Sequence, residues 1–146
     1  MKIFGEKIQG IEYLTRTGSY GVLLDGRGVG VVRSSGYDTY FLVGGGIDEG
    51  ETQHSSLERE AHEEIGFEIE IGEKLGEALE YFYSRAEKRH VAKECHFYRV
   101  SLAGETAEKG KHELVWLPEG EIDRMHHQCY RWILELELKR KKPAGL

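Results

Sequence analysis

The sequence predicts an α+β fold: one domain in which a central mixed β-sheet has helices on both faces, an α/β/α sandwich. The length of 146 residues suits a single domain with a sizeable core. Apolar residues make up 39% of the chain and charged residues 32%, a balance that favours folding over disorder. Short β-type runs surround two segments with helical spacing that lie far apart in the sequence, and such an order is typical of a sheet covered by helices.

The first half of the chain predicts three strands. Residues 20–24 form a short β-type run, and residues 25–28 (DGRG) follow as a strong turn signal. Residues 29–33 return as a second strand, so we expect a β-hairpin here. A third strand is predicted at residues 39–43, and it leads directly into the glycines of residues 44–46.

A helix is predicted from Thr52 to Ile65, with Gly66 as its C-terminal cap. At about 100° per residue, Leu57, Ala61 and Ile65 fall on one stripe. This stripe is therefore the expected core face of the helix.

The second half of the chain predicts three more strands and a longer helix. Residues 78–84 and 94–100 alternate in strand fashion and are joined by a charged loop. Residues 114–117 form a short strand that ends at Pro118. The helix is expected from Glu121 to about Lys139. Its apolar positions are Ile122, Met125, Cys129, Ile133 and Leu136.

Acidic side chains gather on one part of the first predicted helix. Glu60 and Glu64 lie one above the other beside the core stripe, and Glu63 lies about a quarter turn further round. Like charges at this spacing repel by roughly 0.2–0.5 kcal/mol per pair. Oxygen-rich clusters of this kind suit hard divalent cations, Mg²⁺ above all. The alternative is a solvated charged face, which the glycine loop before the helix makes less attractive because glycine allows close backbone approach to a ligand.

The same segment resembles the signature of the Nudix hydrolases. That signature is a glycine, five residues, Glu, seven residues, and then Arg-Glu-apolar-any-Glu-Glu-any-Gly-apolar. One departure is Val43, where the family often has proline before its glycines. The matching positions are Gly45, Glu51, Arg59, Glu60, Ala61, Glu63, Glu64, Gly66 and Phe67.

The resemblance implies a Nudix-like sandwich over residues 1–146 and a hydrolase that uses Mg²⁺ or Mn²⁺ to cleave a diphosphate linked to another moiety. It implies that Glu51 and Arg59 form an ion pair that orients the helix. The water would be activated by Glu60 or Glu63, which the sequence does not separate, or by an acid elsewhere. A late loop often supplies one more acid in this family, and Glu113 is the candidate, the alternative being an ordinary exposed glutamate. The implied metal ligands are Glu60, Glu63, Glu64, the backbone near Gly45 and Glu113, with Gly45 and Gly46 forming the binding loop.

Several substrates and one other function class remain open. The expected substrate is a small nucleoside diphosphate derivative: a nucleoside triphosphate, an oxidised nucleotide or a dinucleoside polyphosphate. Tyr81 and Tyr83 share one strand face, where either could stack on a base or serve core or interface packing. By the resemblance, a tyrosine at about this distance after the motif implies the last of these substrates. Basic residues in the segment 84–94, Lys93 among them, either contact phosphates or form a solvated hairpin tip. The alternative function is a Nudix-like sensor that binds a nucleotide without cleaving it.

Composition and charge make nucleic acid and membranes less attractive as partners. The formal net charge of -6 disfavours nucleic acid, since phosphate contacts need clustered Lys and Arg, and this makes capped or triphosphorylated RNA ends a less attractive substrate. No apolar run is long enough for a membrane span, and no signal peptide is visible, so a cytoplasmic protein is expected. Cys95 and Cys129 are expected as reduced core or half-buried residues, with a lone disulfide as the alternative. Monomer and homodimer both stay open.

Overall fold

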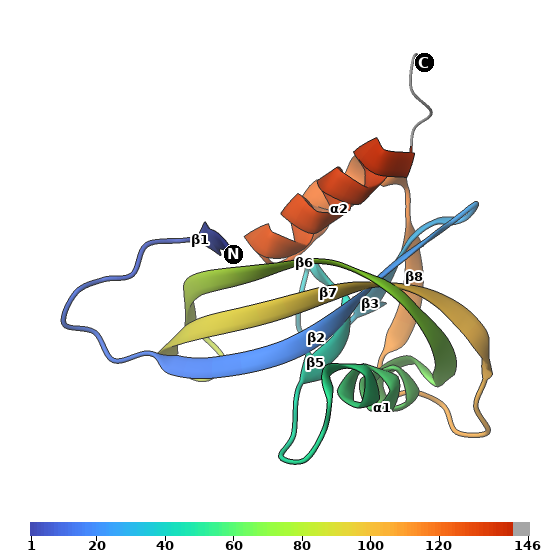
Figure 1. Cartoon of the computed structure of the whole chain (residues 1–146), viewed down its shortest axis with the longest axis horizontal. Helices are drawn as coiled ribbons and strands as arrows, with labels where there is room; N and C mark the ends of the chain where they lie inside the picture. The colour runs from blue at the N-terminus through green and yellow to red at the C-terminus, as the bar shows by residue number, and fades with distance from the viewer. Residues whose placement is uncertain (142–146) are drawn as a thin grey trace.

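The computed structural model describes residues 1–141 and shows a mixed sheet with one α-helix on each face (Figure 1). The sheet has eight strands in the order β1-β6-β7-β2-β3-β4, with β5 paired to β2 and β8 paired to β3. The predicted sandwich is therefore confirmed. The elements are β1 (Lys2–Phe4), β2 (Leu14–Asp25), β3 (Gly28–Arg33), β4 (Tyr40–Phe41), β5 (Val43–Gly46), α1 (Gln53–Ile65), β6 (Phe67–Ser84), β7 (Arg89–Glu105), β8 (Glu113–Leu117), a 3-10 helix η1 (Glu119–Arg124) and α2 (Gln128–Lys141).

The long strand β2 organises the sheet. It runs parallel to β7 along one edge, while β3 and β5 pair with it in antiparallel fashion along the other. The predicted hairpin is present, with Asp25 opposite Gly28 at its turn. Because β5 pairs with β2, the glycine-rich segment lies beside Gly18–Gly21 near the centre of the sheet.

The glycine segment is a strand in its own right, which the sequence did not predict. The predicted strand 39–43 is divided into β4 and β5, and β5 contains all three glycines. Gly44 has φ 136°, and a Cβ there would lie 2.2 Å from the carbonyl oxygen of Ser19. Only glycine permits this close approach of β5 to β2. The predicted strand 78–84 is the C-terminal part of the longer β6, and the predicted strand 94–100 is the central part of the longer β7.

The prediction of one continuous helix from Glu121 to about Lys139 is wrong. The chain forms η1, becomes extended at Met125, and begins α2 at Gln128. A parallel β-bridge joins Tyr40 to Met125, and the amide of His126 donates a hydrogen bond of 2.7 Å to the carbonyl of Tyr40. These tertiary bonds replace the helical ones.

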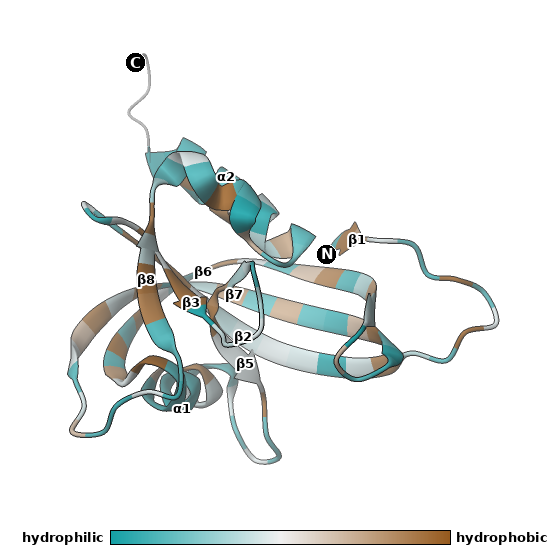
Figure 2. Ribbon diagram, turned by 180° about the vertical axis from the view of Figure 1, so that it is seen from behind, coloured by the Kyte–Doolittle hydropathy of each residue, from teal (hydrophilic) through white to brown (hydrophobic). Residues whose placement is uncertain are grey.

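Two apolar cores hold the layers together, one on each face of the sheet. Figure 2 shows hydrophobic and hydrophilic residues alternating along β6 and β7, a pattern typical of strands that bury one face more than the other. The predicted core stripe of α1 is buried, whereas Leu136 on α2 is 40% exposed. The core under α2 is built on Tyr20, Val22, Val29, Val31, Leu42, Phe97, Cys129, Tyr130, Ile133 and Leu134. The core over α1 is built on Leu23, Val32, Val43, Leu57, Ala61, Ile65, Tyr98 and Val100.

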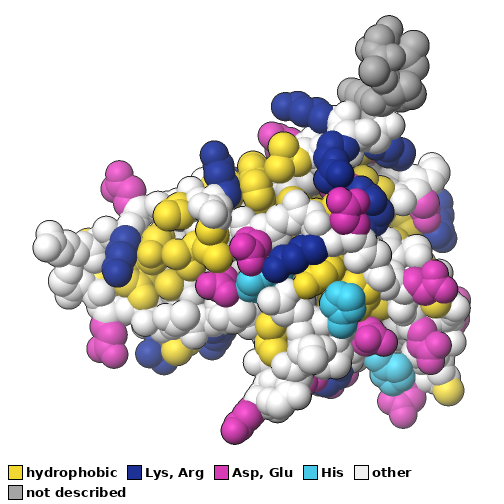
Figure 3. All heavy atoms as spheres, in the orientation of Figure 1, with side chains coloured by type: hydrophobic (Ala, Val, Ile, Leu, Met, Phe, Trp, Pro, Cys, Tyr) yellow, Lys and Arg dark blue, Asp and Glu magenta, His cyan; other side chains and the backbone are white. Residues whose placement is uncertain are grey.

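Three further features bear on the sequence predictions. Cys95 and Cys129 are both buried free thiols whose sulfur atoms lie 3.8 Å apart, so the core reading is confirmed and the disulfide is absent. Within residues 1–141, no helix combines the length and apolar character needed to cross a membrane. Acidic and basic side chains are interspersed on the face shown in Figure 3, without a continuous basic stripe.

Candidate active site

Helix α1 is fixed at both ends by its own caps and by a neighbouring loop. Thr52 and Ser55 form a capping box at the N-terminus, an arrangement worth about 1 kcal/mol. Gly66 closes the C-terminus with φ 70°, a left-handed conformation that suits glycine. The amides of Lys111 and His112 donate hydrogen bonds of 2.8 Å to the last turn of the helix. The helix is therefore rigidly placed against the sheet.

Two carboxylates of α1 face the glycine strand β5. Glu64 Oε1 accepts a hydrogen bond of 2.8 Å from the backbone amide of Gly44. The carboxyl carbon of Glu60 lies so close to Gly45 that a Cβ on that glycine would approach it to 2.7 Å. The glycines thus make room for acidic side chains from the neighbouring layer.

Arg59 connects three parts of the site: the loop before α1, α1 itself and β5. Its Nε donates to Glu51 Oε2 at 2.7 Å and its Nη2 to Glu51 Oε1 at 3.0 Å, so the predicted contact is present in bidentate form. Its Nη1 contacts Glu60 at 3.0 Å and Glu63 at 3.1 Å. Its Nη2 also donates to the carbonyl of Gly46 at 3.1 Å. One guanidinium therefore ties the loop before α1 to two of the helix carboxylates and to β5.

The carboxylates on the sheet side of α1 are hard to ionise. Burial raises the pKa of Glu64 to about 8, against the opposing effects of the Gly44 amide and the Lys93 charge. Burial also raises the pKa of Glu60, although the Arg59 guanidinium acts in the other direction. Glu51 shows the reverse: its hydrogen bonds from Arg59 lower its pKa. Additional positive charge beside Glu60 and Glu64 would stabilise their ionised forms.

The carboxylates of Glu60, Glu63 and Glu64 are of the kind that binds a hard divalent cation, but they are not arranged around one. Within the described range 1–141, no three carboxylate, imidazole or thiol groups converge in a metal-binding arrangement. Glu60 and Glu63 are engaged by Arg59, and Glu64 is turned toward the Gly44 amide. The three glutamates nevertheless place carboxylate oxygens on one helix, and among residues 1–141 the ion-pair partner of Glu60 and Glu63 is Arg59. Such oxygen sets suit Mg²⁺ or Mn²⁺.

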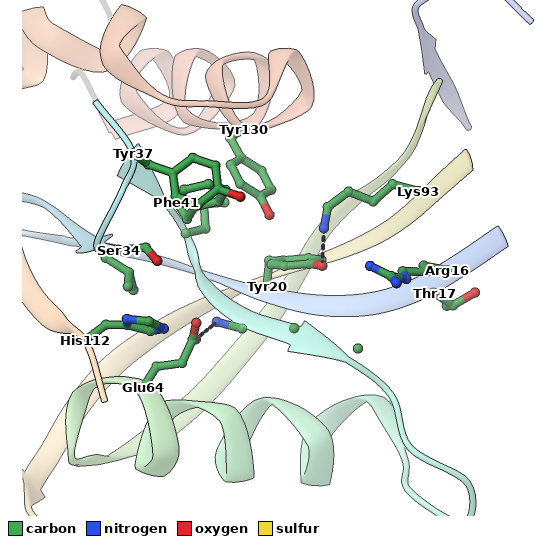
Figure 4. Close-up of a pocket in the computed structure, with 15 residues that line it drawn as sticks. Arg16, Thr17, Tyr20, Ser34, Tyr37, Phe41, Glu64, Lys93, His112 and Tyr130 are labelled. Carbon is green, nitrogen blue, oxygen red and sulfur yellow. Dashed lines mark hydrogen bonds between the residues drawn. The ribbon is translucent and has the colours of Figure 1, made fainter. Parts of the chain in front are cut away.

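A pocket of about 330 Å³ opens beside Glu64 and the glycine strand (Figure 4). Aromatic side chains form one side of it: Tyr37 and Phe41 make an edge-to-face pair at 5.1 Å, and Tyr130 reaches in from α2. The other side is polar and carries Arg16, Thr17 and Lys93. The complete lining is Arg16, Thr17, Tyr20, Val32, Ser34, Tyr37, Phe41, Leu42, Gly44, Gly45, Gly46, Glu64, Lys93, His112 and Tyr130.

Comparison with known proteins assigns the family. The NUDIX domain matches residues 14–143. The chain belongs to the NUDIX family. A curated relative, an 8-oxo-(d)GTP phosphatase of Mycolicibacterium smegmatis (strain ATCC 700084 / mc(2)155), is 30% identical over 114 residues. The match covers 77% of this chain and 34% of that protein, so the chain spans about a third of the relative's length.

Solved structures share the NUDIX fold over most of the chain. The E. coli dihydroneopterin triphosphate pyrophosphohydrolase superposes with a TM-score of 0.69 and 16% identity, covering 85% of this chain and 95% of that one. The MutT protein from Methanosarcina mazei Go1 gives a TM-score of 0.63 and 20% identity, covering 91% and 100% respectively. At these identities the likeness establishes the fold alone.

The predicted site residues of this NUDIX domain are brought together with one exception. Glu51, Arg59, Glu60 and Glu63 form a connected group, and Glu64 joins it through β5. The remaining candidate, Glu113, does not line the pocket. Its carboxylate contacts Arg33 at 3.4 Å and its side chain is 65% exposed. The neighbouring His112 lines the pocket instead.

Sequence reasoning missed most of the pocket wall. Tyr20, Tyr37 and Phe41 carried no motif, and Lys93 was grouped with a charged loop. The structure places Lys93 inside β7, with its side chain lining the pocket. Tyr81 packs against Tyr13, with ring centroids 5.2 Å apart, so it is not part of this pocket. The only available signal was strand alternation, which does not specify a ligand.

Proposed function

We propose that this NUDIX domain is a hydrolase, dependent on Mg²⁺ or Mn²⁺, that cleaves a pyrophosphate bond in a nucleoside diphosphate linked to another moiety. The observation that carries the proposal is the placement of the Glu60 and Glu64 carboxylates against the glycine strand, at the border of a pocket with an aromatic wall. Acidic oxygen ligands next to a pocket for a flat ring are what a metal-bound nucleotide requires.

Three glutamates of α1, called the acidic group below, would hold the metal. They are Glu60, Glu63 and Glu64, and the backbone of Gly45 lies beside them. When bound, a divalent cation neutralises phosphate charge and lowers the pKa of a coordinated water. Arg59 keeps the carboxylates of Glu60 and Glu63 in place by its own attachment to Glu51. Glu60 and Glu63 are the two candidates for removing a proton from the attacking water.

The rest of the pocket supports a nucleotide as substrate. Tyr37 and Phe41 present aromatic faces and edges on which a base can stack. Arg16 and Lys93 carry positive charge on the polar side. The substrate candidates are a nucleoside triphosphate, an oxidised nucleotide and a dinucleoside polyphosphate. The 8-oxo-(d)GTP phosphatase relative supports placing oxidised purine nucleotides first among them.

A substrate panel tests the proposal. Release of phosphate, pyrophosphate and nucleotide should be followed for nucleoside triphosphates, 8-oxo-purine nucleotides, dinucleoside polyphosphates and nucleotide sugars, with added Mg²⁺ or Mn²⁺ and with EDTA. We expect turnover that requires the metal and favours one of the first three classes. Tight nucleotide binding without turnover of any compound would overturn the proposal in favour of a sensor.

A further inference from the structure

Lys93 occupies an unusual position for a lysine. It projects from the first third of β7 into the pocket and is only partly exposed. Its ammonium donates a hydrogen bond of 2.5 Å to the hydroxyl of Tyr20 and lies 4.5 Å from the centre of that ring (Figure 4). The ring of Tyr130 is 5.8 Å away.

No carboxylate among residues 1–141 lies within the 4.0 Å ion-pair distance of this ammonium. Its cross-strand neighbour is Glu80, but the Glu80 carboxylate is bound to His127 at 3.0 Å and to the amide of Cys129 at 2.8 Å. The other cation of the pocket, Arg16, pairs with Glu87. Within the described residues, Lys93 therefore lines the pocket without an ion-pair contact, and the charge of Glu64 acts on it only at longer range.

An ammonium held away from bulk water without a counter-charge is costly, and folded proteins rarely keep one unless it is paired. Contact with aromatic faces recovers part of that cost. The ammonium has three N–H groups, of which Tyr20 uses one. The remaining donors can be completed by an anionic group that enters the pocket.

Tyr20 adds a second donor at the same point. Lysine can only donate, so the Tyr20 hydroxyl oxygen is the acceptor in their hydrogen bond and the hydroxyl proton stays available. The absence of a side chain at Gly18 makes this arrangement possible, because a Cβ there would lie 2.7 Å from the Tyr20 hydroxyl. Two donors thus converge on one location of the pocket wall.

We infer that Lys93 and Tyr20 form an anion subsite that binds a phosphoryl group of the substrate, separate from the acidic group on α1. Lys93 is then a specificity-determining residue, since it favours compounds with a phosphoryl group beyond the one held at the acidic group. Identifying the anion as phosphoryl rests on the proposed function. The presence of an anion subsite rests on the geometry of β2 and β7.

The direct test is calorimetric binding of inorganic pyrophosphate to the full chain in EDTA at pH 7. The variants are Lys93→Met, Lys93→Arg and Tyr20→Phe, with Lys139→Met on the exposed face of α2 as the matched control. We expect Lys93→Met to weaken binding about 10- to 100-fold, the loss typical of one charge-assisted hydrogen bond. Lys93→Arg and Tyr20→Phe should lose less, and Lys139→Met should bind as the natural chain does.

Two comparisons separate this role from others. A structural role predicts that Lys93→Met lowers the urea midpoint, whereas an uncompensated ligand-binding cation predicts an equal or higher midpoint. Recognition of a base carbonyl predicts that the same variant weakens binding of an unphosphorylated nucleoside. Unchanged pyrophosphate binding, a lowered midpoint, or an equal loss for the nucleoside would each overturn the inference.

Kinetics distinguish this inference from the proposed function. For a substrate turned over by the natural chain, Lys93→Met should raise KM with a smaller change in kcat, because the contact is made with the ground state as well as the transition state. A chain that binds pyrophosphate through Lys93 but hydrolyses nothing would overturn the proposed function and leave the subsite intact. A chain that hydrolyses nucleotides with the same KM after Lys93→Met would overturn the anion subsite and leave the proposed function intact.

Discussion

The carboxylate of Glu64 accepts a hydrogen bond of 2.8 Å from the backbone amide of Gly44, which joins the acidic face of α1 to the glycine strand β5. This contact sets the distance between the helix and the sheet at the point where Glu60 lies against Gly45. The glycines and the glutamates of the motif therefore contact one another in the fold, even though a loop and most of a helix separate them in the sequence.

Replacing Gly45 by alanine should disturb the acidic group. The new Cβ would lie 2.7 Å from the Glu60 carboxyl, so that side chain must move. We expect kcat/KM to fall at least 10-fold, with less than about 1 kcal/mol change in the free energy of unfolding, because the displaced group is a side-chain end. Gly46→Ala is the control, since its Cβ would meet nothing within 4 Å. Equal activity of the two variants would contradict the placement of Glu60.

Loss of the Glu51 charge should act through Arg59. Glu51→Gln removes the bidentate ion pair and leaves the guanidinium free to shift toward Glu60 and Glu63. We expect kcat/KM to decrease about 10- to 100-fold, as for other residues that orient metal ligands. The exposed Glu49 provides a control in the same loop. If Glu49→Gln and Glu51→Gln have the same small effect, the orienting role is wrong.

The raised pKa of Glu64 predicts a pH-dependent stability of the metal-free protein. The folded chain keeps a proton on Glu64 up to about pH 8, whereas the unfolded chain releases it near the ordinary value of 4.5. Raising the pH through this window favours the unfolded state, so the free energy of unfolding should fall by an amount on the order of 2–4 kcal/mol.

Urea denaturation in EDTA between pH 5 and pH 9 measures this effect. Glu64→Gln should remove the pH-dependent loss and be more stable than the natural chain at pH 9. The matched control is Glu58→Gln, an exposed position on the same helix. Parallel curves for the natural chain and Glu64→Gln would show that Glu64 titrates normally.

The sequence predicted those parts of the fold that local chemistry determines. Thr52 and Gly66 cap α1 as the pattern indicated, and the DGRG turn makes the expected hairpin. The break before α2 was missed because it depends on Tyr40, which is more than eighty residues away in the chain. The backbone of Tyr40 bonds to Met125 and His126 and so competes with helical hydrogen bonds there. Local spacing carries no information about such a competitor.

The candidate site was predicted to the extent that it is contained in one helix. Glu60, Glu63 and Glu64 are close in sequence, so helical geometry relates them. Lys93 and Tyr20 come from strands that pair in parallel register, with Tyr20 opposite Phe97 rather than Lys93. Their contact depends on side-chain length and on the space left by Gly18, which strand alternation does not predict.

The most direct measurement compares Glu63→Gln with Glu58→Gln in Mg²⁺-dependent hydrolysis of the preferred nucleotide. Both changes remove one charge from α1, but Glu63 belongs to the Arg59 group while Glu58 is exposed away from it. We predict that Glu63→Gln lowers kcat at least 100-fold at unchanged thermal stability, and that Glu58→Gln retains the natural rate. Full metal-dependent activity of Glu63→Gln would contradict the assignment of the acidic face of α1 as the catalytic centre.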